Sequence, residues 1–528
     1  MANPTPAAPA SDGSGDIAAL AKGGQTNFIG FLLRLAARLP FLFIAGRLYG
    51  AEALGRFASA LVVVELVALL CSMGEKRGLA QRLAEGDARE ANLVFDGILL
   101  AVLFSALAAL FFWFVPAPLF PSGQYTELDR LIMLAIPAFA LTEIVLAAQA
   151  YRYDIATTVR ARAIVEPWTI SIMAGALYFV PQTRDSGLSL AYLISIYAGL
   201  LTGLWTFLRS YGLPRDWRPH PVAMTRLTAR AFPLAIADAI EWGTRRVDIF
   251  ILGLFAAPAA VGVYYVAQQV ASLPQKLKTS FEPILGPVIT KNLKAKNYAA
   301  IAQQVCQVGF WIVAAQAGIA LALGMPGEAV MGLVGPNFVG GTGALAFLLA
   351  AEVVAATAVV SEAALVYVAR VRNLWISIAT IAFQAALTVG LIVLVERAGY
   401  GEPYKAAAAA AALMIALGLA SLVKALLLAR ILGHPINNWR WALVWATGPA
   451  VAVGYGATFL PEWAELTFGI PAILLTYGWV IWHRGFGPED RVLFRRNMGG
   501  GEPEAGPEAG PEAQVEAQPV PQPDPRAK

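Results

Sequence analysis

The sequence has little charge, few cysteines and few histidines for its length. Only 14% of its 528 residues are charged and 58% are hydrophobic, whereas a typical soluble domain has about 25% charged residues. The two cysteines, Cys71 and Cys306, lie in apolar stretches, which argues against a disulfide framework or a cysteine metal site. The three histidines, all in basic segments, form no ligand cluster. We therefore expect an integral membrane protein without a metal site or a cofactor.

Long apolar runs are abundant in the sequence. A helix needs about 20 apolar residues to cross the hydrocarbon core of a bilayer. The runs predict an all-α membrane protein with about 14 transmembrane helices. They lie near residues 26–48, 53–74, 92–115, 130–150, 159–180, 187–208, 229–256, 259–281, 300–324, 341–368, 373–396, 405–430, 440–460 and 465–483.

Lysine and arginine are concentrated in every second connection between these runs. Examples are EKRGLAQRLAEGDARE and YRYDIATTVRAR, which are the second and fourth connections. Because basic connections stay in the cytoplasm, the even-numbered connections and both termini are predicted to be cytoplasmic. Residues 1–24 and 486–528 are rich in Pro, Ala, Gly and acidic residues and are expected to be disordered cytoplasmic tails.

Two stretches match each other without a gap at an offset of 207. RLPFLFIAGRLYGAEALG begins at Arg38 and RRVDIFILGLFAAPAAVG begins at Arg245, and the match also pairs Gly55 with Gly262. The two stretches lie on the first and seventh predicted helices, which point the same way, so the match predicts two parallel six-helix halves. The expected divisions are an N-lobe over 25–212, a cytoplasmic linker over 213–228, a C-lobe over 229–432 and two added helices over 433–485.

Charged residues form ordered rows on two of the apolar helices. Residues three and four apart share one face of a helix. The seventh predicted helix carries Asp238, Glu241, Arg245 and Asp248, and the first carries Asn27, Arg34 and Arg38. Because lipid cannot solvate such rows, we expect them to face a water-filled cavity between the halves.

Two interpretations of these rows remain open. In the first, the row on the seventh helix is an internally paired zipper, since Glu241 and Asp248 flank Arg245. In the second, the rows bind a ligand. Arg34 and Arg38 have no acid on their own helix face and Glu65 could neutralise only one of them, so at least one guanidinium would be free for an anion such as a phosphate.

Other carboxylates predicted to lie in the membrane have two possible roles. Those on or beside the charged row, Asp238, Glu241, Asp248 and Glu65, could carry a proton or a sodium ion. For four further glutamates, a structural role that satisfies neighbouring helices is the better interpretation: Glu143, Glu166, Glu352 and Glu362.

The stretches RLYGAEALGRFA and DIFILGLFAAPAAVGVYYVAQQVASLPQKLKTSFEPILGPVI resemble the polysaccharide-biosynthesis flippases of the multidrug/oligosaccharidyl-lipid/polysaccharide exporter superfamily. The resemblance implies two lobes around a cationic cavity that work by alternating access. It also implies an undecaprenyl-pyrophosphate-linked oligosaccharide as cargo, carried to the periplasmic leaflet of a bacterial inner membrane. Arg34, Arg38 and Arg245, with Asn27 beside them, would then bind the cargo. Implied partners are membrane lipids and the polysaccharide polymerase machinery, with no role for nucleic acid.

Three alternative functions follow from the same features. The helix count also resembles that of lipid II flippases. A cation-coupled drug antiporter of the same fold would need an acidic or aromatic cavity, which the basic row on the first helix argues against. A glycosyltransferase or polymerase would need large outer loops, but the longest predicted ones, PAPLFPSGQYTELD and MPGEAVMGLVGPNFVGG, are short. Because the sequence contains no nucleotide-binding loop or catalytic triad motif, we expect a transporter rather than an enzyme.

Overall fold

A computed structural model describes residues 39–85, 89–219, 221–279, 289–290, 292–488 and 490–491. All regular secondary structure in these ranges is helical. The described residues up to Gly485 form one compact unit. The predicted tail over 1–24, and nearly all of the one over 486–528, lie outside the described residues.

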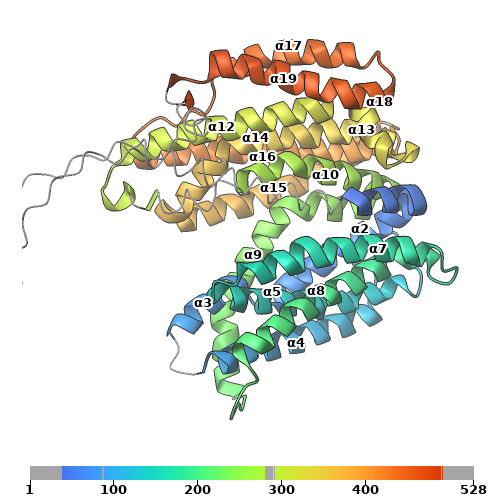
Figure 1. Ribbon diagram of the computed structural model, residues 1–528, viewed down its shortest axis with the longest axis vertical. Helices are drawn as coiled ribbons and strands as arrows, with labels where there is room; N and C mark the ends of the chain where they lie inside the picture. Colours follow the sequence, from blue (N-terminus) through green and yellow to red (C-terminus); the bar gives the residue numbers. More distant parts are fainter. Residues whose placement is uncertain are drawn as a thin grey trace, which may run out of the picture. The chain divides into compact units, whose positions relative to one another are not determined.

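The helices before residue 220 correspond to the predicted N-lobe (Figure 1). Asp154 caps one of them, since its side chain accepts a hydrogen bond from the backbone N–H of Thr157. In chain order they are η1 (Ala45–Tyr49), α2 (Gly50–Cys71), α3 (Glu75–Glu85), α4 (Glu90–Phe114), η2 (Asp129–Leu134), α5 (Ala135–Tyr151), α6 (Ile155–Val159), η3 (Arg160–Val165), α7 (Glu166–Tyr178), η4 (Arg184–Ser186) and α8 (Gly187–Tyr211).

The helices after residue 220 correspond to the predicted C-lobe and the two added helices. Gly433 ends α16 in the left-handed conformation, with φ of 69°, which glycine adopts without strain. In chain order they are α9 (Pro221–Phe255), α10 (Pro258–Thr279), α12 (Tyr298–Gly324), α13 (Gly327–Val334), η5 (Pro336–Gly341), α14 (Thr342–Val368), α15 (Arg370–Arg397), α16 (Glu402–Leu432), α17 (Ala442–Ala457), α18 (Glu462–Ala464), η6 (Glu465–Gly469), α19 (Ile470–Val480) and η7 (Ile481–Gly485).

Helix boundaries repeat along the chain at the offset of the matched stretches. The 3₁₀ turn η2 begins at Asp129 and η5 begins at Pro336, an offset of 207, and each continues directly into a long α-helix. Helices α2 and α10 begin at Gly50 and Pro258, an offset of 208. These boundaries agree with an internal repeat, while the division into two lobes at the residues given above stays a prediction.

Nine helical segments in the described ranges are long and apolar enough to cross a membrane. Since a helix pairs its own backbone groups, such segments are stable in lipid. The chain is therefore a multi-pass membrane protein, while the count of fourteen crossings and the cytoplasmic termini stay predictions. The nine are Leu39–Cys71, Glu90–Phe114, Asp129–Tyr151, Arg184–Tyr211, Tyr298–Gly324, Pro336–Val368, Arg370–Arg397, Glu402–Leu432 and Glu462–Gly485.

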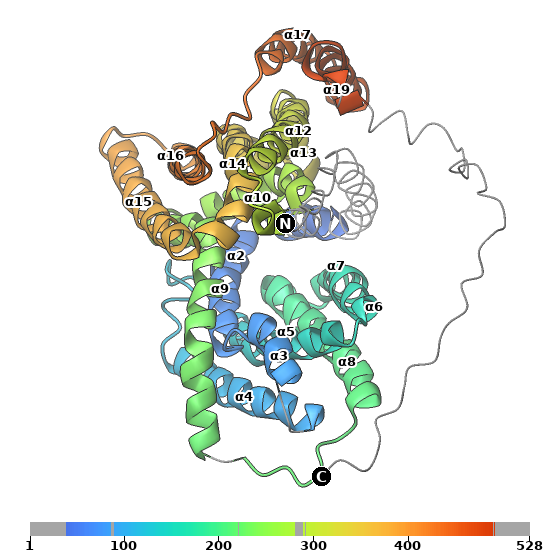
Figure 2. The same ribbon diagram turned by 90° about the vertical axis from the view of Figure 1, so that its left-hand side faces the viewer.

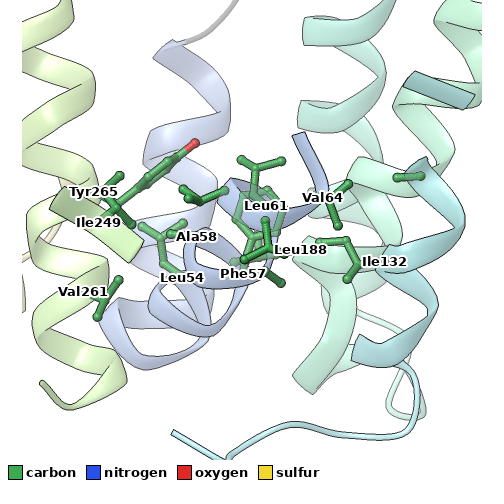
Figure 3. Packing of buried hydrophobic residues seen from close by; sticks show 14 of the residues in the cluster. Leu54, Phe57, Ala58, Leu61, Val64, Ile132, Leu188, Ile249, Val261 and Tyr265 are labelled. Carbon is green, nitrogen blue, oxygen red and sulfur yellow. The ribbon is translucent and has the colours of Figure 1, made fainter. Parts of the chain in front are cut away.

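Helix α2 lies at the centre of the apolar core cluster (Figure 3). Phe57 is 1% exposed and packs with Leu188 of α8 on one side, while Ile249 of α9 and Val261 of α10 lie on the other. Because α2 contacts helices from both sequence halves, it joins them. Figure 2 shows α9 running beside α2, and α9 also contacts α15.

Helices α2 and α10 cross with their backbones in contact. A Cβ atom added to Gly55 would lie 1.7 Å from the carbonyl oxygen of Pro258, and one added to Gly262 would lie 2.0 Å from that of Ala51. Only glycine permits this approach, as in other close crossings of membrane helices. The two glycines are the pair matched by the sequence offset, so equivalent positions of the two halves contact each other.

Candidate functional site

Arg245 in the charged row of α9, together with the adjacent Arg246, connects both halves of the chain. Arg245 and Arg246 are consecutive, so their side chains point about 100° apart. Arg245 Nη1 donates a hydrogen bond of 3.1 Å to Glu352 Oε1 on α14. Arg246 Nη2 lies 3.9 Å from Glu65 Oε2 on α2. One helix thus holds two neighbouring cations against carboxylates from opposite halves of the sequence.

The environment of Arg246 is polar and incompletely hydrogen-bonded. Glu65 also accepts a hydrogen bond of 3.4 Å from Trp242 Nε1, one turn before Arg246. Arg246 Nη1 and the Tyr192 hydroxyl of α8 are both buried without a hydrogen-bond partner among the described residues. Arg246 interacts electrostatically with Tyr192 and with Tyr265 of α10. Unsatisfied donors that lie together mark a place where a polar ligand or water completes the hydrogen bonding.

A second ion cluster lies beside Tyr192. Arg162 pairs with Glu143 of α5 and, at 2.7 Å, with Glu166 of α7, and it interacts electrostatically with Tyr192. Its guanidinium carbon lies 4.7 Å from the centre of the Phe139 ring. Arg162 lies in η3, a π-helical turn, and such turns are frequent at functional sites.

Sequence reasoning missed Arg162, because it counted this residue among the basic residues of a cytoplasmic connection. The four-residue spacing of Arg162 and Glu166 was the available signal, since it places both side chains on one helix face. Glu352 was interpreted as structural, and its pairing with Arg245 could not be read from sequence because the two lie 107 positions apart.

The remaining members of the α9 row differ in environment. Asp248 is fully buried; it accepts hydrogen bonds from the Tyr264 hydroxyl and, at 3.4 Å, from Gln268 Nε2. Asp238 is buried, whereas Glu241 is exposed. Asp248 is therefore held by neighbours of the same half of the chain.

Another buried cation joins helices within one half. Lys424 of α16 is 2.9 Å from Glu362 of α14 and 3.4 Å from the Ser377 hydroxyl of α15. Its side chain is only 8% exposed. Through these two contacts Lys424 links three helices.

Asn27, Arg34 and Arg38 lie outside the described residues, so their predicted role and the predicted pairing of Glu65 with one of these arginines stay predictions. Within the described part, four glutamates accompany three arginines in the two clusters: Glu65, Glu143, Glu166 and Glu352 with Arg162, Arg245 and Arg246. A net cationic cavity would therefore depend on Arg34 and Arg38. No group of three or more His, Cys, Asp or Glu that could hold a metal occurs among the described residues.

The chain matches a known protein family in sequence and known transporters in fold. The sequence model of the family described as polysaccharide biosynthesis protein matches residues 44–314, slightly more than half of the chain. This range contains both ion clusters apart from Glu352. No curated protein sequence matches the chain.

Solved structures share the fold at low sequence identity. An inward-facing multidrug resistance MATE family transporter of the MOP superfamily is 14% identical with a TM-score of 0.61, over 76% of this chain and 98% of that one. An outward-facing one is 12% identical with a TM-score of 0.54, over 78% and 96%. A MOP superfamily transporter from Pyrococcus furiosus is 14% identical with a TM-score of 0.55, over 80% and 96%.

Proposed function

Because the chain belongs to the polysaccharide biosynthesis protein family, we propose that it is a flippase for an undecaprenyl-pyrophosphate-linked oligosaccharide. It is a membrane transporter rather than an enzyme. In this proposal the cargo moves from the cytoplasmic to the periplasmic leaflet of a bacterial inner membrane. Membrane lipids and the polymerase machinery are the proposed partners.

The observation that carries the proposal is the unsatisfied guanidinium of Arg246 at the junction of the halves. A guanidinium binds phosphate through a planar fork of permanent donors. At 3.9 Å the contact with Glu65 is loose, and an anion could replace that carboxylate. Asn27, Arg34 and Arg38 are proposed to complete the site from the first helix.

If pyrophosphate replaces the carboxylates that contact the two arginines, its binding could drive the alternating access of the transporter. Arg246 contacts Glu65 in the first half, and Arg245 contacts Glu352 in the second. A pyrophosphate that engages both arginines weakens both ion pairs and so removes a link between α9 and each half. A ligand shifts a conformational equilibrium only through such differential contacts. The lipid tail stays in the bilayer throughout.

A second candidate function is cation-coupled antiport, which the excess of glutamates over arginines in the two clusters favours. Intramembrane carboxylates mark ion relays. We propose Glu65 and Asp238, with Glu241 and Asp248 on the same helix as Asp238, as the groups that would carry a proton or sodium ion. Coupling of this kind is compatible with the flippase and also with a drug antiporter. Lipid II is an alternative cargo with the same pyrophosphate.

The deciding experiment is lipid extraction from cells depleted of the protein, with quantification of undecaprenyl-pyrophosphate oligosaccharides. Complete repeat units should accumulate, and the wild-type gene should clear them. Arg246→Ala should clear them roughly 10- to 150-fold more slowly, because a charge-assisted hydrogen bond of about 1.5–3 kcal/mol is lost. The Arg245→Ala variant should also clear them more slowly. The substitution removes one phosphate ligand and the contact of α9 with Glu352.

The matched control is Arg397→Ala, at an exposed position at the end of α15, which should clear the lipid normally. Normal clearance by Arg246→Ala at equal expression would contradict the cationic site. If no lipid-linked sugar accumulates but sensitivity to cationic drugs changes, the antiporter replaces the flippase. Accumulation of lipid II alone would identify that cargo instead.

A further inference from the structure

Two adjoining cavities lie at the end of the bundle where the odd-numbered connections gather, which the charge distribution predicts to be the periplasmic end. Each has a volume of about 560 Å³, within the range of about 300–1,000 Å³ typical of small-molecule sites. Their linings share Leu48 and Tyr49, and the first of the two cavities is here called the outer groove. The outer groove is lined by the first, third and fifth connections, whereas the second cavity contains Arg47 and reaches Asn337 in η5 of the second half.

The groove contains three tyrosines that are held in place by neighbours. The Tyr49 hydroxyl donates a hydrogen bond of 2.7 Å to the carbonyl of Ala174, and its ring packs edge-on against Tyr178 at 5.4 Å. Arg184 lies 4.3 Å from the Tyr178 ring centre. Tyr125 stacks on Phe120 with ring centres 5.0 Å apart. These rings are fixed before any ligand arrives, so little ordering cost remains for binding.

Polar groups of balanced charge complete the lining. Glu52 and Asp185 carry negative charge, and Arg56 and Arg184 carry positive charge. Arg56 already pairs with Glu52 at 3.3 Å and donates to the Asp185 carbonyl at 3.2 Å. Gln124 is exposed and offers an amide with both donors and an acceptor. The groove therefore presents many hydrogen-bonding groups without a net charge that would select an ion.

We infer that the outer groove binds the saccharide part of the cargo, as an uncharged oligosaccharide. Sugar rings have apolar faces that pack on fixed aromatic rings and hydroxyl edges that need planar polar side chains, and the groove supplies both. This inference rests on the proposed function for its ligand class. It adds a site separate from the arginines that would hold pyrophosphate, so that sugar and pyrophosphate would be recognised at different depths of the protein.

The test is saturation-transfer difference NMR on the full-length protein in lipid nanodiscs, with maltotriose and triacetylchitotriose as probes. Both should receive saturation from the wild-type protein. The double variant Gln124→Ala/Tyr125→Ala should reduce the signal by about fivefold or more, in line with the loss of one hydrogen bond and one stacking contact. The Tyr125→Phe variant keeps the aromatic ring and should retain most of the signal. This result would separate the loss of stacking from a general loss of folding.

Tyr400→Ala is the matched control, because Tyr400 is an exposed tyrosine that lies in another odd-numbered connection but outside the groove. It should leave the signal unchanged. No transfer to either trisaccharide, or equal transfer in the double variant and the wild type, would overturn the inference. Arg246→Ala should bind the trisaccharides normally. Sugar binding in a protein whose depletion causes no lipid accumulation would refute the flippase alone, and accumulation without sugar binding would refute the groove alone.

Discussion

The crossing of α2 and α10 gives the sharpest structural prediction. Cβ atoms essentially never approach another heavy atom closer than 3.0 Å, yet one on residue 55 would lie 1.7 Å from the Pro258 oxygen. Gly55→Ala must therefore displace the two helices by about 1.3 Å, since 3.0 less 1.7 is 1.3. That oxygen belongs to the backbone, so no side-chain rotation relieves the clash.

The expected effect is a shift between arrangements of the halves rather than unfolding. Overpacking costs typically about 1–3 kcal/mol, which corresponds to roughly a 5- to 150-fold change in a conformational equilibrium. The cost falls only on the arrangement in which α2 and α10 touch. Gly262→Ala should act in the same direction, and the double variant should be less than additive because the first substitution already separates the backbones.

Pulsed electron–electron double resonance, which measures the distance between two spin labels, checks this prediction. Cys71 and Cys306 are replaced by alanine, and labels are placed at Ser122 and Asn337, exposed positions in the two halves. In Gly55→Ala, the fraction of molecules with the label-to-label distance of the wild-type protein should fall. Gly448→Ala in α17, where an added Cβ meets nothing within 4 Å, is the control and should leave the distribution unchanged. An unchanged distribution in Gly55→Ala would refute the reasoning.

Three further predictions concern charged contacts. Glu65→Gln should tighten the binding of inorganic pyrophosphate about tenfold, because it removes the carboxylate that competes for Arg246; calorimetric titration that shows no change would argue against that competition. Asp248→Ala should lower the thermal midpoint, since leaving its buried donors unsatisfied costs about 1–3 kcal/mol, and an unaltered midpoint would contradict this role. The hydrogen bond from Arg230, with a second from Gln81, holds the pKa of Glu85 below its usual 4.5. The contact of α3 with α9 is therefore complete above that pH and is lost as the pH falls through the lowered pKa. The protection factors of the α3 amides, which correct for the slower intrinsic exchange at low pH, should fall on acidification in the wild type but not in Glu85→Gln.

Much of the fold was predictable because membrane insertion follows local composition. A run of about 20 apolar residues can satisfy its backbone in lipid only as a helix, whatever its neighbours are. The apolar stretches therefore marked the long apolar helices between α2 and α19, whereas the short helices α3 and α13 lie in segments predicted to be connections. The offset of 207 anticipated the matching positions of η2 and η5. The helix count was less certain, because α9 and α10 carry charges and an internal proline each.

The candidate site was only partly predictable, because ion pairs depend on which helices become neighbours. Spacing placed Arg245 and Asp248 on one face of α9 and turned Arg246 away from it. It could not indicate that Arg245 would meet Glu352, that Arg246 would meet Glu65, or that Asp248 would be satisfied by α10.

The sequence by itself thus determined the membrane class, the helical segments, the repeat and the rows of charge, because each follows from composition or from helical periodicity within one segment. Tertiary structure alone decided which carboxylate each arginine contacts, the burial of Asp238 beside the exposure of Glu241, and the close contact of Gly55 with Gly262. These depend on how helices far apart in the chain pack, and in lipid that packing is set by shape and by a few polar contacts rather than by hydrophobicity.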